Sequence, residues 1–188
     1  IGTCLVGSEM CIRDSPMTSL NPLFTVEQQL KETIHANMKV TDEEAYQRAL
    51  SLMQQVGIPQ PENRLKQFPH QFSGGMRQRV VIAIALAGEP DLIIADEPTT
   101  ALDVSIQDQI LSLIRELCIK NNVGCMLVTH DMGVVSNVTD RVAVMYRGDL
   151  VEFGNTAKVL GDPDHPYTRS LISACLLYTS DAADERRC

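Results

Sequence analysis

Residues 72–103 read FSGGMRQRVVIAIALAGEPDLIIADEPTTALD, and the main elements of the fold can be predicted from this stretch. It opens with a Ser-Gly-Gly turn of the kind that starts a helix. Val80–Leu86 is apolar on every side, so the helix is expected to be buried, and Gly88 and Pro90 are expected to end it. Leu92–Ala95 is an aliphatic run typical of a central parallel strand covered on both faces. The stretch therefore predicts a buried helix followed by a buried strand.

Both ends of this stretch carry groups that suit phosphate chemistry. Ser73 is a strong N-cap, and the backbone N–H groups of Gly74 and Gly75 are expected at the positive end of the helix dipole, where anions bind. The two glycines also let a phosphate approach the backbone closely. At the other end, Asp96 can hold Mg²⁺ and Glu97 can polarise a water that attacks a phosphate. Together the two ends predict nucleotide hydrolysis.

Each of these signals has an ordinary structural alternative. A Ser-Gly-Gly sequence is most often a simple turn, and an Asp-Glu pair after a strand is often part of a solvated loop. The aliphatic run before Asp96 and the strand-ending Pro98 favour a carboxylate pair held at a strand end. A lone histidine is also more often structural than catalytic. His130, however, directly follows the predicted strand Val123–Thr129, at the edge where ligands bind in open α/β sheets.

Four motifs in order resemble the ATP-binding subunit of an ABC transporter: signature motif, Walker B, D-loop and switch histidine. They are Phe72–Met76, Leu92–Glu97, Ala101–Asp103 and Thr129–Asp131. The resemblance covers about residues 16–174. It implies an α/β fold, a partial P-loop NTPase with a helical subdomain and a truncated, mostly parallel sheet. The form Phe-Ser-Gly-Gly-Met, where the family usually has Leu and Gln at the first and last positions, is similar to the peptide and nickel importer branch. His165-Pro166-Tyr167-Thr168 resembles a marker of the same branch.

The resemblance implies a role for each motif residue. Glu97 would be the general base or water-positioning group, and His130 would contact the γ-phosphate of ATP. Asp96 would hold Mg²⁺, and Asp103 would face the partner subunit. The signature residues that would close on the nucleotide of the partner subunit are Ser73, Gly74, Gly75 and Met76.

The sequence contains no G-x-x-x-x-G-K-[ST] motif, which would form the main phosphate cradle. We expect this motif upstream of Pro16, and the family's Q-loop glutamine would fall at Asp14. The full-length parent is therefore expected to hydrolyse ATP, whereas this chain alone is expected to be inactive. The resemblance implies a second ABC ATPase subunit, identical or related, two membrane permease subunits and, indirectly, a periplasmic solute-binding protein. It implies a peripheral place on the cytoplasmic face of the bacterial inner membrane.

Two other functions remain open at this stage. One is a non-transport ABC ATPase of DNA repair or the ribosome, which would lack the His-Pro-Tyr-Thr segment. The other is a non-hydrolysing interaction module, which the intact carboxylates and histidine disfavour. Dipeptide, oligopeptide, nickel and glutathione importers share these motifs, so the solute is not defined.

Both ends of the chain resemble translated sequencing adapters. The DNA that can encode Cys175–Ser180 is the reverse complement of the interior of the DNA that can encode Glu9–Ser15, a relation that unrelated protein segments rarely share. We therefore leave both ends out of the fold prediction. The expected organisation is residues 1–15 and 175–188 adapter-derived, 16–88 helical subdomain with the signature motif, 89–147 catalytic α/β core, and 148–174 C-terminal extension.

Composition excludes several classes of function. The net charge of −8 without a basic run predicts no nucleic-acid partner. No apolar stretch approaches the about 20 residues that a membrane helix needs. Outside the adapter-like ends only Cys118 and Cys125 remain, and two scattered cysteines predict a reduced cytosolic protein without a disulfide framework or a zinc site.

Local signals outline the remaining elements. Thr25 and Thr41 each open a capping box before an amphipathic helix. The core-facing positions of these helices are Val26, Leu30 and Ile34 in the first, and Ala45, Ala49, Met53 and Val56 in the second, with Gly57 at its end. The other predicted elements are a helix over Val104–Lys120, two strands in Arg141–Phe153 around Arg147-Gly148, and a short helix near Thr156–Leu160.

Overall fold

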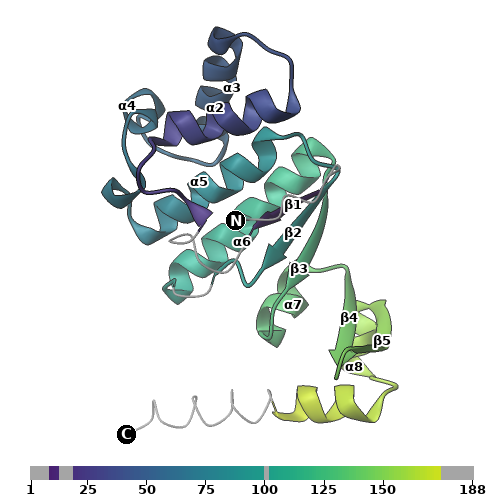
Figure 1. Ribbon diagram of the computed structural model, residues 1–188. Helices are drawn as coiled ribbons and strands as arrows, with labels where there is room; N and C mark the ends of the chain where they lie inside the picture. Colours follow the sequence, from purple (N-terminus) through teal and green to yellow (C-terminus); the bar gives the residue numbers. More distant parts are fainter. Residues whose placement is uncertain (1–8, 13–18, 100–101, 175–188) are drawn as a thin grey trace, which may run out of the picture. The chain divides into compact units, whose positions relative to one another are not determined.

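The computed structural model describes residues 9–12, 19–99 and 102–174 (Figure 1). The chain forms two compact units, Ile1–Val128 and Thr129–Cys188, and each is described by itself. The first unit carries the signature motif and the Walker B strand, and the second begins just before His130. The domain boundaries expected from the sequence concern the organisation of a longer protein and stay predictions.

A three-stranded parallel sheet organises the first unit. Its order is β1 (Glu9–Ile12), β2 (Leu92–Asp96) and β3 (Gly124–Val128), so β2 is the central strand, as predicted. The register pairs Met10 with Ile93 and Ile93 with Cys125. Because alternate residues of a strand point to opposite faces, Cys125 shares a sheet face with Ile93.

Among the described residues of the first unit, four α-helices precede the D-loop and one follows it. They are α2 (Val26–Asn37), α3 (Asp42–Gln55), α4 (Pro61–Leu65), α5 (Gly74–Ala87) and α6 (Val104–Asn121), with a 3₁₀ turn η1 at Pro69–Gln71. Both predicted capping boxes are present. The hydroxyl of Thr25 accepts from the N–H of Gln28, and that of Thr41 accepts from the N–H of Glu44. Helix α3 ends where predicted, because Gly57 adopts φ 71° just after it.

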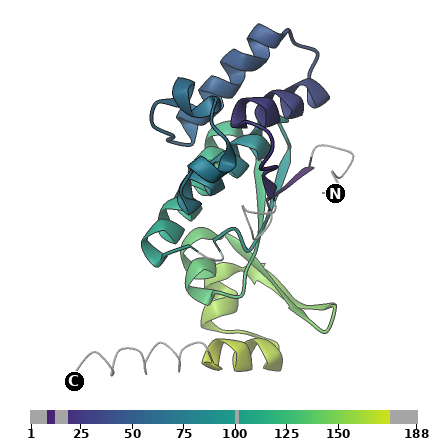
Figure 2. The ribbon, with the colours of Figure 1, turned by 60° about the vertical axis from the view of Figure 1, so that its left-hand side comes forward.

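Helix α5 is the centre of the core, as its apolar sequence predicts. It packs against α2 and α3 on one side and against β1 and α6 on another (Figures 1 and 2). Its fully covered apolar residues join those of α2, α3 and α6 in one cluster. Members with almost no exposed surface include Leu30, Ile34, Met53, Ile82, Ile93 and Ile110.

The prediction that β2 is covered on both faces is wrong for the part of the chain that the structure describes. Ile93 and Ala95 are buried, but Leu92 and Ile94, which point to the other face, are only half-buried. On β3 the exposed fractions of Met126 and Val128 are 48% and 44%. The reason is that α5 and α6 pack against the strands from one side, where they bury the face that carries Ile93.

Strand β1 was not expected, because residues 1–15 were left out of the fold prediction. Glu9–Ile12 nevertheless pairs with β2, and Ile12 is fully buried. An extended segment on the edge of β2 satisfies backbone N–H and C=O groups that would otherwise lack partners. Alternation also turns Met10 and Ile12 towards the core and leaves Cys11 exposed. Conformation says nothing about the origin of these residues, so the adapter interpretation stays a prediction.

The second unit is a hairpin with short helices. It contains α7 (Met132–Val138), β4 (Arg141–Tyr146), β5 (Asp149–Asn155) and α8 (Thr156–Gly161). The strands are antiparallel, and Arg147 and Gly148 connect them with φ of 54° and 94°, the positive angles of a tight hairpin turn. The predicted hairpin and the predicted short helix are both confirmed.

The His-Pro-Tyr-Thr segment has a structural role in this unit. The carboxylate of Glu152 on β5 accepts from the backbone N–H groups of Asp164 and His165, at 2.8 and 3.1 Å. The ring of Tyr167 lies 4.2 Å from that of Tyr146, centroid to centroid. These contacts fix the segment against the hairpin.

Candidate functional site

The signature end of the site is the first turn of α5. Ser73 is its N-cap, as predicted, and its hydroxyl accepts from the N–H of Met76 at 3.3 Å. The first N–H groups of a helix have no carbonyl of their own helix to bind. Ser73 is exposed and Gly74 and Gly75 are half-buried. The turn therefore presents backbone donors at the surface of the first unit.

The two signature glycines also lie against the D-loop side of the same unit. A Cβ atom built on Gly75 would stand 2.9 Å from Cγ2 of Ile106, and one on Gly74 would stand 3.5 Å from Cδ2 of Leu102. Leu102 and Ile106 flank Asp103, which is the N-cap of α6. A separation of 2.9 Å is too short for real side-chain carbons, so Gly75 is required by the close approach of α5 to α6. The sequence interpretation assigned this glycine to phosphate approach alone and missed the packing.

The carboxylate end of the site lies where β2 ends. Asp96 is the last residue of β2 and is exposed, and Glu97 follows it and is half-buried. The N–H of Glu97 donates to the carbonyl of Val128 on β3 at 2.9 Å, which continues the ladder one residue past the strand. This edge of a parallel sheet is the one where ligands bind in open α/β folds.

Glu97 has a backbone conformation that is unusual for its residue type. Its φ is 43°, in the left-handed region that costs a residue with a side chain about 1–2 kcal/mol. Such residues gather at functional sites, where the surrounding structure holds them in place. Here the hydrogen bond to Val128 and the buried Pro98 hold the turn.

The remaining predicted site residues lie elsewhere. Asp103 is exposed at the start of α6, and its side chain makes no capping hydrogen bond within the described chain. Thr100 and Ala101 of the D-loop lie outside the described residues. His130 is exposed in the second unit, where the next residue, Asp131, caps α7 by accepting from the N–H of Gly133 at 2.8 Å. The structure thus brings Asp96 beside Glu97 and the signature glycines beside the D-loop, all in the first unit. His130 belongs to the second unit.

Of the two carboxylates at the strand end, Asp96 is the exposed one that a cation would meet. Among residues 9–12, 19–99 and 102–174, no group of three or more His, Cys, Asp or Glu side chains gathers as a metal site. Mg²⁺ does not need such a cage, because it is usually bound by one or two carboxylates together with substrate phosphates and water. The exposed Asp96 fits that limited contribution.

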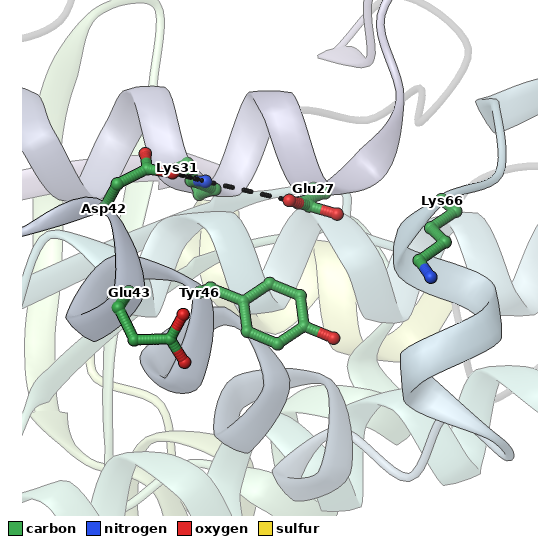
Figure 3. A pocket seen from close by; sticks show the side chains of 6 residues that line it. All are labelled: Glu27, Lys31, Asp42, Glu43, Tyr46 and Lys66. Carbon is green, nitrogen blue, oxygen red and sulfur yellow. Dashed lines mark hydrogen bonds and ion pairs between the residues drawn. The ribbon is translucent and has the colours of Figure 1, made fainter.

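A separate pocket of about 330 Å³ lies on the helical part and involves none of the predicted site residues (Figure 3). Its lining residues are Glu27, Lys31, Asp42, Glu43, Tyr46 and Lys66. The ammonium of Lys31 lies 2.6 Å from Asp42 and 3.7 Å from Glu27, so the charges pair across α2 and α3. The hydrogen bond from Lys31 lowers the pKa of the Asp42 carboxyl, and the same bond raises the pKa of Lys31. The Lys31–Asp42 pair ties α2 to the start of α3, whereas the Lys31–Glu27 pair lies within α2.

Comparison with a solved structure identifies the class of the fold. The dimeric post-hydrolysis state of the ATP-binding cassette MJ0796, which is bound to ADP and Pi, matches with a TM-score of 0.65 and 27% identity. The match covers 79% of this chain and 64% of that one. The fold is thus that of an ABC ATPase cassette, present in part, as the sequence predicted.

Sequence comparison makes the assignment more specific. Residues 9–100 match the family model described as ABC transporter. The chain is 53% identical over 174 residues to the oligopeptide transport ATP-binding protein OppD of Bacillus subtilis, covering 93% of this chain and 49% of that protein. It is 54% identical over 163 residues to the dipeptide transport ATP-binding protein DppD of the same organism, covering 87% of this chain and 49% of that protein. The chain therefore spans about half the length of these curated relatives.

Within the described residues, no helix is both long enough and apolar enough to cross a bilayer.

Proposed function

We propose that the parent protein is the ATP-binding and ATP-hydrolysing subunit of an ABC importer for dipeptides, oligopeptides or a related solute such as nickel. The observation that carries the proposal is the strand end at Asp96 and Glu97, where a left-handed glutamate is hydrogen-bonded to the neighbouring strand. A carboxylate residue with a strained backbone at the ligand-binding edge of a parallel sheet supports a catalytic role. The similarity to OppD and DppD supports the solute class.

The chemistry assigned to the strand end is divided between two carboxylates. Glu97 positions the attacking water and accepts its proton, and Asp96 holds Mg²⁺, directly or through a water. When bound, Mg²⁺ neutralises charge on the phosphate oxygens. His130 contacts the γ-phosphate of ATP in this proposal, and its place after β3 in the chain supports that role.

The signature turn acts on the nucleotide of a second ATPase subunit, identical or related. The signature residues Ser73, Gly74, Gly75 and Met76 face the phosphates of that nucleotide, with the backbone N–H groups of the two glycines as donors, and Asp103 faces the partner subunit. The exposure of Ser73 and Asp103 supports both contacts. Two permease subunits and, indirectly, a periplasmic solute-binding protein complete the assembly. The protein lies peripherally on the cytoplasmic face of the bacterial inner membrane, and nucleic acid is not a partner.

The absence of a G-x-x-x-x-G-K-[ST] motif from the sequence supports the inference that this chain alone does not turn over ATP. We further infer that residues 1–15 and 175–188 derive from sequencing adapters. Amplifying the gene with primers inside residues 19–174 and sequencing outward tests that inference, since native codons at either end would contradict it.

A chimera tests the function. Residues 19–174 replace the corresponding segment of B. subtilis OppD, which then supplies the remainder of the cassette. The chimera is expected to hydrolyse ATP, and Glu97→Gln is expected to lower kcat by roughly a hundredfold or more while ATP still binds. Glu116→Gln, on the exposed side of α6, is the matched control and should leave kcat unchanged.

The same chimera separates the alternatives. Uptake of an oligopeptide by cells that carry the chimera in place of OppD supports the importer. ATP hydrolysis without any uptake favours a non-transport ATPase, and a folded chimera that binds but never hydrolyses ATP favours an interaction module. Equal turnover by the chimera and by its Glu97→Gln variant removes the basis of the catalytic assignment.

A further inference from the structure

Two thiols in the first unit lie against each other. Cys118 is in the last turn of α6 and has an exposed fraction of 6%, whereas Cys125 is the second residue of β3 and is exposed. The chain between them reverses direction at Asn122, which adopts φ 55°, and the N–H of Val123 donates to the carbonyl of Cys118 at 2.9 Å. Each thiol also shifts the pKa of the other, which agrees with that proximity. They are therefore neighbours in space, not the scattered cysteines that the sequence suggested.

The strand register explains why the thiols meet. Cys125 pairs with Ile93, so its side chain points to the face of the sheet that holds the buried Ile93. Cys118 belongs to the core cluster on that same face, contributed by α6. A shift of β3 by one residue would turn Cys125 to the opposite face and separate the pair.

The two sulfurs are not equivalent. The hydrogen bond to Cys125, together with burial, raises the pKa of the Cys118 thiol. The hydrogen bond donated by Cys118 lowers the pKa of the Cys125 thiol, although burial acts in the opposite direction. The thiolate is the form of cysteine that reacts with oxidants. Cys125 is therefore the reactive and accessible member, and Cys118 is a protonated neighbour within reach of it.

We propose that Cys118 and Cys125 form an oxidation site for hydrogen peroxide, at which the pair closes to an intrachain disulfide between α6 and β3. In the first step the Cys125 thiolate attacks a peroxide oxygen, the O–O bond breaks, and the departing hydroxide takes a proton to leave as water. Cys125 is then a sulfenic acid, oxidised by two electrons. In the second step the Cys118 sulfur attacks the Cys125 sulfur, the S–O bond breaks, and a second water leaves with the Cys118 proton.

A metal-binding role for the pair finds no support in the described residues, where no third His, Cys, Asp or Glu completes a cluster. The disulfide would join the C-terminal end of α6 to the strand that leads towards His130. Neither cysteine is among the candidate nucleotide-site residues, so the test needs no ATPase assay.

Peptide mapping of the full chain tests the proposal. Lys120 lies between the two cysteines, so trypsin separates them into peptides 116–120 and 121–141. The chain is treated with hydrogen peroxide, its remaining thiols are alkylated, and it is digested without reductant. We expect the two peptides to appear joined, lighter by two hydrogen atoms than their sum, and to separate on addition of dithiothreitol. Oxidation of Met126 adds an oxygen atom and cannot imitate the link.

Two variants test the assigned roles. In Cys118→Ser the sulfenic acid on Cys125 has no partner to close on, so its trapping by dimedone should rise several-fold. In Cys125→Ser neither the joined peptides nor a dimedone adduct on Cys118 should form, because that thiol is buried. Cys11, exposed on β1, is the matched thiol, and Cys11→Ser should leave the joined peptides unchanged.

Three outcomes would overturn the proposal. They are the absence of the joined peptides, dimedone labelling of Cys125 that is no greater than that of Cys11, and joining that is as fast in concentrated urea as in buffer. The last result would mean that nearness in sequence, not the fold, brings the thiols together.

Discussion

Replacing Gly75 by alanine probes the contact between the signature turn and the helix after the D-loop. The new Cβ would stand 2.9 Å from Cγ2 of Ile106, whereas ordinary contacts between carbon atoms lie at about 3.5–4.0 Å. Either Ile106 changes rotamer or α5 and α6 separate, and overpacking of this kind costs about 1–3 kcal/mol. Alanine also gains up to about 1 kcal/mol of helix propensity over glycine, which hides part of the cost.

Gly74→Ala is the control that removes this ambiguity. It makes the same chemical change one position earlier, but its Cβ meets Cδ2 of Leu102 at an ordinary 3.5 Å. The gain in propensity is similar at both positions and largely cancels in the difference. Gly75→Ala should therefore be less stable than Gly74→Ala by about 1–3 kcal/mol, measured by urea unfolding of the full chain.

A second substitution identifies the atom responsible. Ile106→Ala removes the Cγ2 methyl, so Gly75→Ala should cost less by at least about 1 kcal/mol in that background than in the wild type. Equal stabilities of the two alanine variants, or an equal cost of Gly75→Ala with and without Ile106, would refute the packing explanation for this glycine.

Three further predictions concern other sites. Glu97→Gly should be more stable than Glu97→Ala by roughly 1 kcal/mol in urea unfolding, because both variants lose the carboxylate but only glycine adopts φ 43° without strain. The reverse order of stability would show that the turn relaxes. The purified chain should show no ATP turnover above a Glu97→Gln control, and turnover abolished by that substitution would contradict the need for a phosphate loop. The N–H and hydroxyl of Thr41 lower the pKa of the Glu44 carboxyl below its ordinary 4.5, so the stabilisation of the fold by this carboxylate is present above that pH and is lost as the pH falls through the folded pKa. The difference in unfolding midpoint between wild type and Glu44→Ala should therefore shrink on acidification. A difference that stays constant with pH would contradict this direction of the pKa shift.

The elements that could be predicted from sequence are those whose signals are local. A capping box places its own donors and acceptors within four residues, so Thr25 and Thr41 marked helix starts that the structure confirms. The Arg147-Gly148 turn is equally local, because two positive φ angles set the hairpin. The aliphatic run directly before Asp96 and Glu97 is also a local signal, and it correctly placed these two residues at a strand end.

The features that could not be predicted depend on residues far apart in the chain. Gly75 meets Ile106, and Cys125 reaches Cys118 only through the register of β3 against β2. The left-handed backbone of Glu97 follows from its bond to Val128 on another strand, and no local sequence rule assigns it to a glutamate. Strand β1 forms because an edge of β2 is available for pairing. The composition of residues 9–12 alone does not show that such an edge exists.

The outer side of β3 has a practical consequence for work with this chain. Within the described residues β3 is paired on one side only, so its other side presents a row of backbone donors and acceptors next to the exposed Met126 and Val128. Such an edge recruits strands from neighbouring molecules. Concentrated solutions should therefore self-associate, and sedimentation should show it. The substitution Met126→Lys, at a position that faces away from the core, offers a remedy that leaves the packing of α5 and α6 untouched.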